Sequence, residues 1–185
     1  MLKKGIRILA LEDAPFTREQ TMALTVGVVA RDTGVEGILA FDVRVDGDDA
    51  TCKIIERVRT SRFNNQIKLI VLNGVSLAGM NIIDMPRVAK ELRIPVIGIT
   101  RTRPRRNLLL AALKKAQPRE VKAKAALLAK ISKSSVTERS GGFYIQCVGI
   151  PKEDAAKMVK QSISLLRLAH LVASGVTKGE SKGRL

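Results

Sequence analysis

The 185-residue sequence contains no tryptophan, one tyrosine and four phenylalanines, so aromatic residues make up only 3% of the chain. Because 45% of the residues are hydrophobic, the core must be built from isoleucine, leucine, valine and alanine. A chain of this length and composition is globular and needs no disulfide or metal staple. The shortage of aromatic rings also argues against base stacking as the main mode of nucleic-acid recognition, and favours contacts to the backbone.

Cysteine is scarce as well. Cys52 and Cys147 lie in separate apolar stretches and form no Cys-x-x-Cys or Cys/His pattern, which excludes a disulfide scaffold and a thiolate zinc site. We expect both to be inert packing residues. The chain also lacks a run of 18 apolar residues, and its start, MLKKGIRILALEDAPF, does not have the pattern of a signal peptide. These absences predict a cytoplasmic protein with no membrane partner.

Acidic residues are nearly absent from the middle of the sequence. The chain carries 33 basic and 17 acidic residues, a formal net charge of +16, yet residues 1–92 are almost balanced. Residues 93–139 hold 13 basic and only two acidic side chains. This distribution predicts a polyanionic partner, nucleic acid before membrane, and places its binding surface in the middle of the chain.

The order of the expected elements predicts an α/β fold. Residues 5–11, 21–31 and 35–45 are apolar or alternating runs with short turns between them, typical of an antiparallel meander. The remaining pattern predicts a helix at 51–60, a strand at 67–72, a helix at 82–92, a strand at 94–100, basic helices at 107–116 and 119–132 split by Pro118, a strand at 143–149 and a helix at 152–174.

A meander followed by two crossovers gives a mixed sheet in the order 3-2-1-4-5 with helices on its faces, which is the ribonuclease H-like arrangement. A doubly wound Rossmann-type sheet is the alternative, but neither GxGxxG nor GxxxxGK[ST] is present to support it. We expect a single domain over residues 1–185, with residues 175–185 forming a flexible tail.

Candidate catalytic residues follow the expected strands. Asp13 stands just beyond the central first strand, Asp46, Asp48 and Asp49 cluster after the third, and Asn73 follows the fourth. Because Mg²⁺ prefers clustered oxygen ligands, we predict a magnesium site at Asp13, Asp46 and Asp49, with Asn73 as a neutral site residue. Structural roles compete with this hypothesis: Asp48 or Asp49 is a natural helix N-cap, and Asp13 and Asp46 begin ordinary turn sequences.

An arginine cluster begins where the fifth expected strand ends. Arg101, Arg103, Arg105 and Arg106 fall within six residues, and Pro104 stiffens the loop that carries them. Guanidinium groups suit phosphate contacts, so we predict that this loop binds nucleic acid, although a solvated basic loop is the alternative. Further basic residues extend this stripe along the two following helices: Lys114, Lys115, Lys122, Lys124 and Lys130.

The single histidine, His170, lies in the apolar stretch LLRLAHLVA, where a helix-packing role is more usual than catalysis. With one histidine in such a setting, no Ser-His-Asp or Cys-His constellation is indicated.

The segments ALEDAPF, VDGDDAT, VLNGVSLAGMNIID, IPVIGITRTRP, FYIQCVGI and LRLAHLVASG together resemble the largely archaeal family called domain of unknown function 99. That family is similar to endonuclease V, a ribonuclease H-like nuclease that cleaves next to deaminated purines such as inosine. The resemblance implies that Asp13 matches the first catalytic aspartate of the nuclease and that a second acid falls within residues 46–49. It also implies that Asn73 replaces the aspartate of strand four, and that Arg101 replaces a lysine.

Three functions stay open at this point. The chain is a magnesium-dependent nuclease acting on DNA or RNA, or a catalytically degenerate nucleic-acid-binding protein that uses the same cleft and basic loop. The third hypothesis is a metal-dependent domain that processes a small-molecule phosphate or a nucleotide. The sequence is also compatible with a homodimer.

Overall fold

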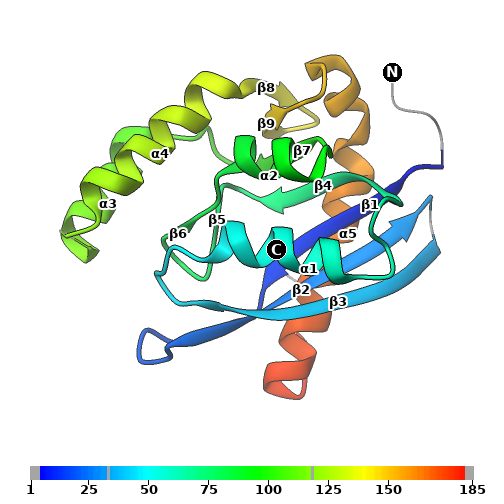
Figure 1. Ribbon diagram of the computed structural model, residues 1–185, viewed down its shortest axis with the longest axis horizontal. Coiled ribbons are helices and arrows are strands. Elements are labelled where there is room, and N and C mark those ends of the chain that lie inside the picture. Colours follow the sequence, from blue (N-terminus) through cyan, green and yellow to red (C-terminus); the bar gives the residue numbers. More distant parts are fainter. Residues whose placement is uncertain (1–4, 33, 118, 182–185) are drawn as a thin grey trace.

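The computed structural model describes residues 5–32, 34–117 and 119–181 (Figure 1). Pro118 and the end of the expected tail, residues 182–185, lie outside the described residues. In chain order the elements are β1 (Arg7–Asp13), β2 (Met22–Arg31), β3 (Gly34–Arg44), α1 (Ala50–Thr60), β4 (Ile67–Asn73), β5 (Ser76–Leu77), β6 (Asn81–Ile82), α2 (Met85–Leu92), β7 (Val96–Thr100), α3 (Arg106–Ala116), α4 (Val121–Ser134), β8 (Val136–Ser140), β9 (Phe143–Val148) and α5 (Lys152–Lys178).

The central sheet has the strand order β3-β2-β1-β4-β7-β9-β8. The first three strands form the predicted antiparallel meander, and β4 and β7 lie parallel to β1. The predicted order 3-2-1-4-5 is therefore confirmed, with β9 and β8 added antiparallel at the β7 edge. Because β1, β4 and β7 are parallel and adjacent, their carboxyl ends meet at one edge of the sheet.

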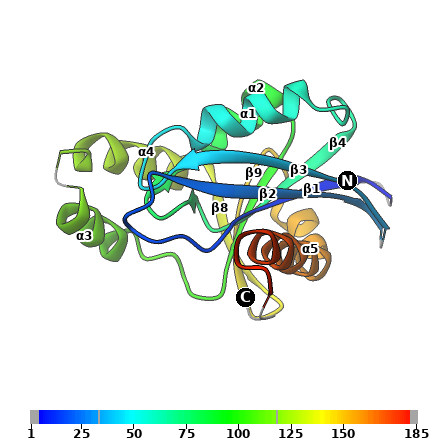
Figure 2. The same ribbon diagram turned by 90° about the horizontal axis from the view of Figure 1, so that it is seen from below.

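Helices cover both faces of this sheet (Figure 2). Side chains alternate along β1: Ile8 and Ala10 pack in the core beneath α5, whereas Leu9 and Leu11 pack in the core beneath α1 and α2. All four are fully buried. The parity of a residue in β1 therefore decides which of the two cores, and which side of the sheet edge, it faces.

Three boundaries differ from the sequence prediction. β1 continues through Glu12 to Asp13, β8 is a strand that the sequence pattern did not predict, and α5 continues to Lys178. Helical residues 175–178 replace the start of the expected tail because Gly179, at φ +76°, donates its backbone N–H to the carbonyl of Gly175 and ends the helix with a left-handed residue.

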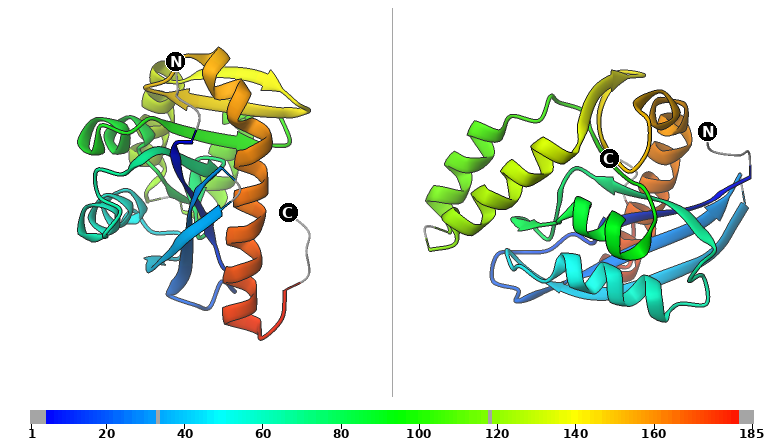
Figure 3. Two further views of the ribbon diagram at one scale, coloured as in Figure 1. Left: turned by 90° about the vertical axis from the view of Figure 1, so that its right-hand side faces the viewer. Right: turned by 45° about the horizontal axis from the view of Figure 1, so that its top comes forward.

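The helices α3 and α4 form a hairpin that stands to one side of the sheet, beyond the strand ends (Figures 1 and 3). Most of α3 is exposed, and Leu113 is its one buried hydrophobic anchor within the described residues. In the described part of the chain, no helix is long and apolar enough to cross a membrane.

Candidate functional site at the carboxyl edge of the sheet

Glu12 is the buried acid of the sheet edge. It has the same parity as Ile8 and Ala10, so it points towards α5, and only 6% of its surface is exposed. Asn73, the last residue of β4, points to the same side and donates its Nδ2–H to Glu12 Oε1 over 3.0 Å. The ends of two adjacent parallel strands thus place a carboxyl group and an amide in direct contact.

His170 reaches the same carboxyl group from α5. Its Nδ1 lies 3.9 Å from Glu12 Oε1, and its Nε2 lies 3.4 Å from the hydroxyl oxygen of Ser174, one helical turn later. The sequence pattern favoured a packing role for this histidine, but the structure places it against a buried acid, with 23% of its side chain exposed. We refer to Glu12, Asn73 and His170 as the edge cluster.

The electrostatics of the edge cluster favour a protonated acid. Burial raises the pKa of Glu12 to about 8, the negative charge of Asp13 raises it further, and the hydrogen bond from Asn73 opposes both. Within the described residues, Glu12 Oε2 and His170 Nδ1 are buried atoms without a hydrogen-bond partner. Such a group can release a proton near neutral pH, or coordinate a cation once it is ionised.

Asp13 points to the opposite side of the sheet. Its Oδ2 accepts a hydrogen bond of 3.1 Å from the backbone N–H of Ala78, and burial raises its pKa although this bond lowers it. The carbonyl of Ala78 in turn accepts a 2.8 Å bond from the backbone N–H of Asp46. One peptide segment, at Ala78, therefore joins the two aspartates that the sequence analysis placed in the site.

The side chain of Asp46 is committed to the backbone of the same segment. Its Oδ1 accepts a 2.8 Å bond from Met80 N–H, and Asp46 itself has a left-handed backbone, with φ +57°. Gly79, between Ala78 and Met80, has φ +84°, and a Cβ at this position would lie 2.4 Å from Asp46 Oδ1. Only glycine allows this close approach, so the turn is built around the Asp46 carboxylate.

Asp49 occupies the N-cap position of α1, but its side chain makes no capping bond. Instead, Asp49 Oδ1 accepts a 2.7 Å bond from Asn81 Nδ2 and a 3.1 Å bond from Arg44 N–H. Burial raises the pKa of Asp49, but these hydrogen bonds outweigh burial and lower it overall. Asp48 is exposed and forms a 3.0 Å ion pair with Arg44.

The predicted magnesium ligands are thus not gathered around one point. Asp13, Asp46 and Asp49 each accept hydrogen bonds from a different part of the backbone, and these bonds direct the three carboxylates apart. Within residues 5–32, 34–117 and 119–181, no three His, Cys, Asp or Glu side chains form a group that could hold a metal ion. The edge cluster instead offers one carboxyl group with an uncommitted oxygen, an amide and an imidazole.

Two hollows flank the edge cluster. One, of about 230 Å³, includes Asn73 and Arg101 in its lining and has apolar walls from Phe143, Ile163 and Leu166. The other, of about 190 Å³, is lined by His170 and by four further residues: Pro15, Ser174, Lys178 and Glu180. The cluster is therefore bordered by open space on two sides, along one face of α5.

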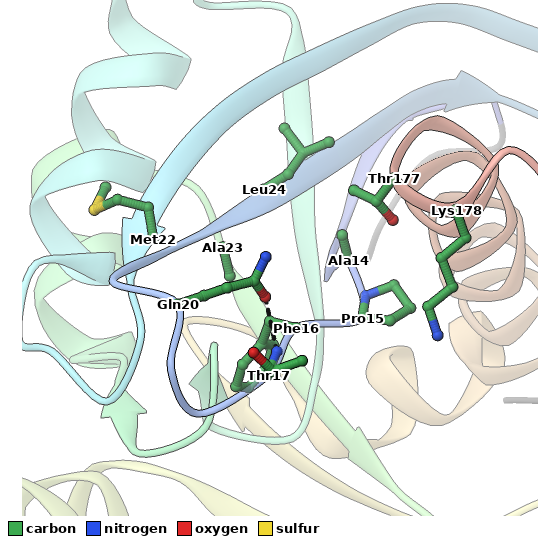
Figure 4. Close-up of a pocket in the computed structure, with 10 residues that line it drawn as sticks. All are labelled: Ala14, Pro15, Phe16, Thr17, Gln20, Met22, Ala23, Leu24, Thr177 and Lys178. Atoms are coloured by element: carbon green, nitrogen blue, oxygen red, sulfur yellow. Dashed lines mark hydrogen bonds between the residues drawn. The ribbon is translucent and has the colours of Figure 1, made fainter.

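A third hollow, of about 280 Å³, adjoins the one at His170 because Pro15 and Lys178 line both. It lies between the segment after β1, the start of β2 and the end of α5 (Figure 4). Its lining consists of Ala14, Pro15, Phe16, Thr17, Gln20, Met22, Ala23, Leu24, Thr177 and Lys178.

The arginine loop begins beside the edge cluster, since Arg101 shares a hollow with Asn73. Arg105 and Arg106 line a separate hollow of about 310 Å³ on the far side of β4, together with Gly74. Arg103 is exposed between them, as are Lys114 and Lys115 on α3. The loop thus brings cations to both sides of the strand ends.

Glu12 and His170 are the two site residues that the sequence analysis did not identify. Parity with Ile8 and Ala10 was the available signal for Glu12, provided that β1 had been extended by two residues. For His170 the signal was its spacing of four residues from Leu166, which is buried on the sheet side of α5. Of the two cysteines, Cys147 is buried as expected, whereas Cys52 is exposed on α1, so its packing role is not confirmed.

Comparisons with known proteins connect this site to nucleases. The family described as Endonuclease dU matches residues 4–177. A UPF0215 protein of Methanothermobacter thermautotrophicus is 40% identical over 98% of this chain and 93% of its own length. A UPF0215 protein of Archaeoglobus fulgidus is 35% identical over 98% of this chain and 99% of its own length.

Solved structures agree with the fold. A protein of unknown function from Archaeoglobus fulgidus has a TM-score of 0.83 at 33% identity, covering 94% of this chain and 99% of that one. Endonuclease V of Ciona intestinalis, in complex with DNA containing an inosine followed by a ribo-adenosine, has a TM-score of 0.52 at 10% identity and covers 85% of this chain and 77% of its own. Human ENDOV has a TM-score of 0.51, also at 10% identity, over 89% and 84%. These similarities confirm the ribonuclease H-like fold and the predicted resemblance to a family like endonuclease V.

Proposed function

Because the chain belongs to the family described as Endonuclease dU, we propose that it is an endonuclease V-like hydrolase that cleaves a phosphodiester bond in DNA or RNA. The observation that carries this proposal is the edge cluster: Glu12, Asn73 and His170 meet at the carboxyl ends of β1 and β4. Active sites of open α/β sheets lie at this edge, where side chains from adjacent parallel strands converge.

The chemistry assigned to the cluster follows from its groups. Hydrolysis of a phosphodiester requires a water molecule to lose a proton and the departing oxygen to gain one. Glu12 and His170 are 3.9 Å apart and can exchange protons at a bond held between them. Asn73 keeps Glu12 oriented through its 3.0 Å hydrogen bond, and Asp13 adds negative charge next to Glu12.

Magnesium is part of the proposal as a cofactor. Mg²⁺ commonly binds through one or two carboxylates, keeps several waters and takes its remaining ligands from substrate phosphates. The free Oε2 of Glu12 and the amide oxygen of Asn73 fit this role, with Asp13 as the second carboxylate. When bound, such a cation polarises the phosphate and lowers the pKa of a coordinated water.

The nucleic-acid contacts are assigned to the arginine loop. Arg101 lines the hollow next to Asn73, so a phosphate bound by its guanidinium lies next to the edge cluster. Arg103, Arg105 and Arg106 are exposed along the same loop and extend these contacts along the backbone. As substrates we propose strands with a deaminated base. Deoxyuridine is suggested by the family description, and inosine by the DNA in the Ciona intestinalis complex.

The test is cleavage of end-labelled DNA and RNA that carry one deoxyuridine, uridine or inosine, with Mg²⁺, Mn²⁺ or EDTA. We expect cleavage that requires the cation and the modified base, and that is lost in Glu12→Gln. Asp49→Asn is the matched control, because it removes a carboxylate at the same sheet edge that is bonded to Arg44 and Asn81. Tight, salt-sensitive binding without cleavage would favour the nucleic-acid-binding alternative, which the neutral Asn73 in place of an acid supports. Hydrolysis of free nucleotides alone would favour the small-molecule alternative.

A further inference from the structure

The cations of the α3–α4 hairpin fall into two groups. Four are exposed and have no carboxylate partner within the described residues, and they gather where α3 ends and α4 begins. We call them the tip cluster: Lys114, Lys115, Arg119 and Lys122. Two other lysines, Lys124 and Lys130, are engaged in contacts with the body of the protein.

Lys124 fixes the position of the tip. It is 5% exposed, and its ammonium group donates to the backbone carbonyl of Asp46 over 2.7 Å, to Gln117 Oε1, and to Glu120 Oε2 over 2.8 Å. An ammonium group has three donors, so all of them are satisfied, as a buried charge requires. Gln117 Nε2 donates to the same Asp46 carbonyl over 2.7 Å. The tip is thus held against the turn that contains Asp46.

The other end of the hairpin is held near the arginine loop. Lys130 pairs with Asp84 at the start of α2, and α4 ends at Ser134, next to β8. Lys122 and Lys133 are both exposed and lie 11 residues apart, which puts them on one face of α4 and roughly 16 Å apart along its axis. One strand of a duplex rises 3.4 Å per nucleotide, so this separation spans about five phosphates.

We propose that the tip cluster binds the phosphates of a flanking stretch of nucleic acid, about five nucleotides beyond the phosphates bound by the arginine loop. The inference rests on the proposed nuclease function and specifies its substrate as a polymer long enough to reach both ends of the hairpin. A hairpin anchored at both ends presents its cations at a fixed distance from the edge cluster, so a short oligonucleotide reaches the edge cluster without reaching the tip.

The test measures binding in EDTA, in which cleavage does not interfere, as a function of salt concentration. The variant replaces the tip cluster by alanine at all four positions, and the ligands are a 30-mer duplex with a central modified base and an 8-mer with the same base. On the 30-mer, we expect the slope of log K against log salt to fall by up to about 3 relative to the parent protein, since each lost contact removes roughly 0.7–0.9. On the 8-mer, we expect no change.

A matched control removes the same charge from other elements. It replaces three exposed lysines and one exposed arginine by alanine, namely Lys68, Lys90, Lys160 and Arg167. We expect this control to keep the parent slope on both ligands. An unchanged slope for the tip variant on the 30-mer, an equal loss on the 8-mer, or an equal loss in the control would overturn the inference and leave the proposed function standing. Absence of binding by the parent protein to both ligands would instead refute the proposed function.

Discussion

The two faces of the sheet edge use carboxyl groups in opposite ways, although Glu12 and Asp13 are consecutive in the chain. On the α5 face, Glu12 is bonded to a side chain, lies near His170 and keeps one oxygen without a hydrogen-bond partner in the described residues. On the other face, Asp13 and Asp46 accept hydrogen bonds from backbone N–H groups of residues 78–80. The alternation of side chains along β1 produces this division.

The difference separates acids that hold the fold from acids that are available for chemistry. A carboxylate that accepts backbone hydrogen bonds stabilises a turn, and its replacement disturbs that turn. A buried carboxyl group with an unpaired oxygen and a raised pKa destabilises the fold when it ionises, and such groups concentrate at functional sites. By this criterion the α5 face is the reactive one, and the Asp46 turn is its support.

The largest effect is expected from exchanging one face for the other in the cleavage assay. Glu12→Gln should lower the single-turnover rate by about 10²–10⁴-fold, the range for loss of a group that transfers a proton. Asp13→Asn keeps an oxygen that can accept from Ala78, and should lower the rate by about tenfold or less. If Asp13→Asn costs as much as Glu12→Gln, the division between the two faces is wrong for catalysis.

The pH dependence of stability tests the same division without a substrate. Glu12 has an ordinary pKa of 4.5 and a folded-state pKa of about 8, so between these values only the unfolded chain loses the proton. The free energy of unfolding therefore falls as the pH rises from 4.5 to about 8, and levels off outside this window.

The Glu12→Gln variant lacks this titration, so we expect the Tm of the parent protein, measured in EDTA and relative to that of the variant, to fall by several degrees across the window. A constant difference in Tm would mean that Glu12 is ionised in the folded protein.

Much of the sheet could be predicted from the sequence because hydrophobic runs and short turns determine it. The runs near residues 5–11, 21–31 and 35–45 become β1, β2 and β3, and the order of elements determined which strands are adjacent. β8 was missed because its sequence, VTERS, carries little apolar signal, and its pairing with β9 sets its conformation. Local patterns report burial along one element, and an edge strand with polar side chains depends on its partner instead.

The site was predicted less well because it depends on side-chain direction. Asp13 was favoured over Glu12 since the apolar run ends at Leu11, whereas hydrogen bonds to β2 and β4 extend the strand and turn Glu12 inward. Lys124 was assigned to a basic stripe, yet it shares a helical face with Leu128 and Ile131, both buried. That spacing of four and seven residues was visible in the sequence, but the carbonyl of Asp46 that Lys124 binds was not.

A smaller effect is expected from making the α5 face more acidic. Asn73→Asp removes the amide donor to Glu12 and adds a carboxylate next to it, so in EDTA the free energy of unfolding should fall by about 1–3 kcal/mol. If the cluster holds a cation, Mg²⁺ or Mn²⁺ should raise the Tm of this variant more than that of the parent protein. An equal response of the two proteins to both cations would place the metal elsewhere.

The smallest global effect is expected on the supporting face. Lys124→Met removes three hydrogen bonds but also a buried charge, so the two changes partly offset each other and the free energy of unfolding should fall by about 1 kcal/mol. The local effect should be larger, with faster amide exchange across α3 and α4 and unchanged exchange in β1 and β4. Lys130→Met, on the same helix but with a half-exposed ion pair to Asp84, is the control and should change neither by more than about 1 kcal/mol. If Lys124→Met left hairpin exchange unchanged while slowing cleavage as strongly as Glu12→Gln, Lys124 would belong to the reactive face, and the division between supporting and reactive groups would fail at its best-buried cation.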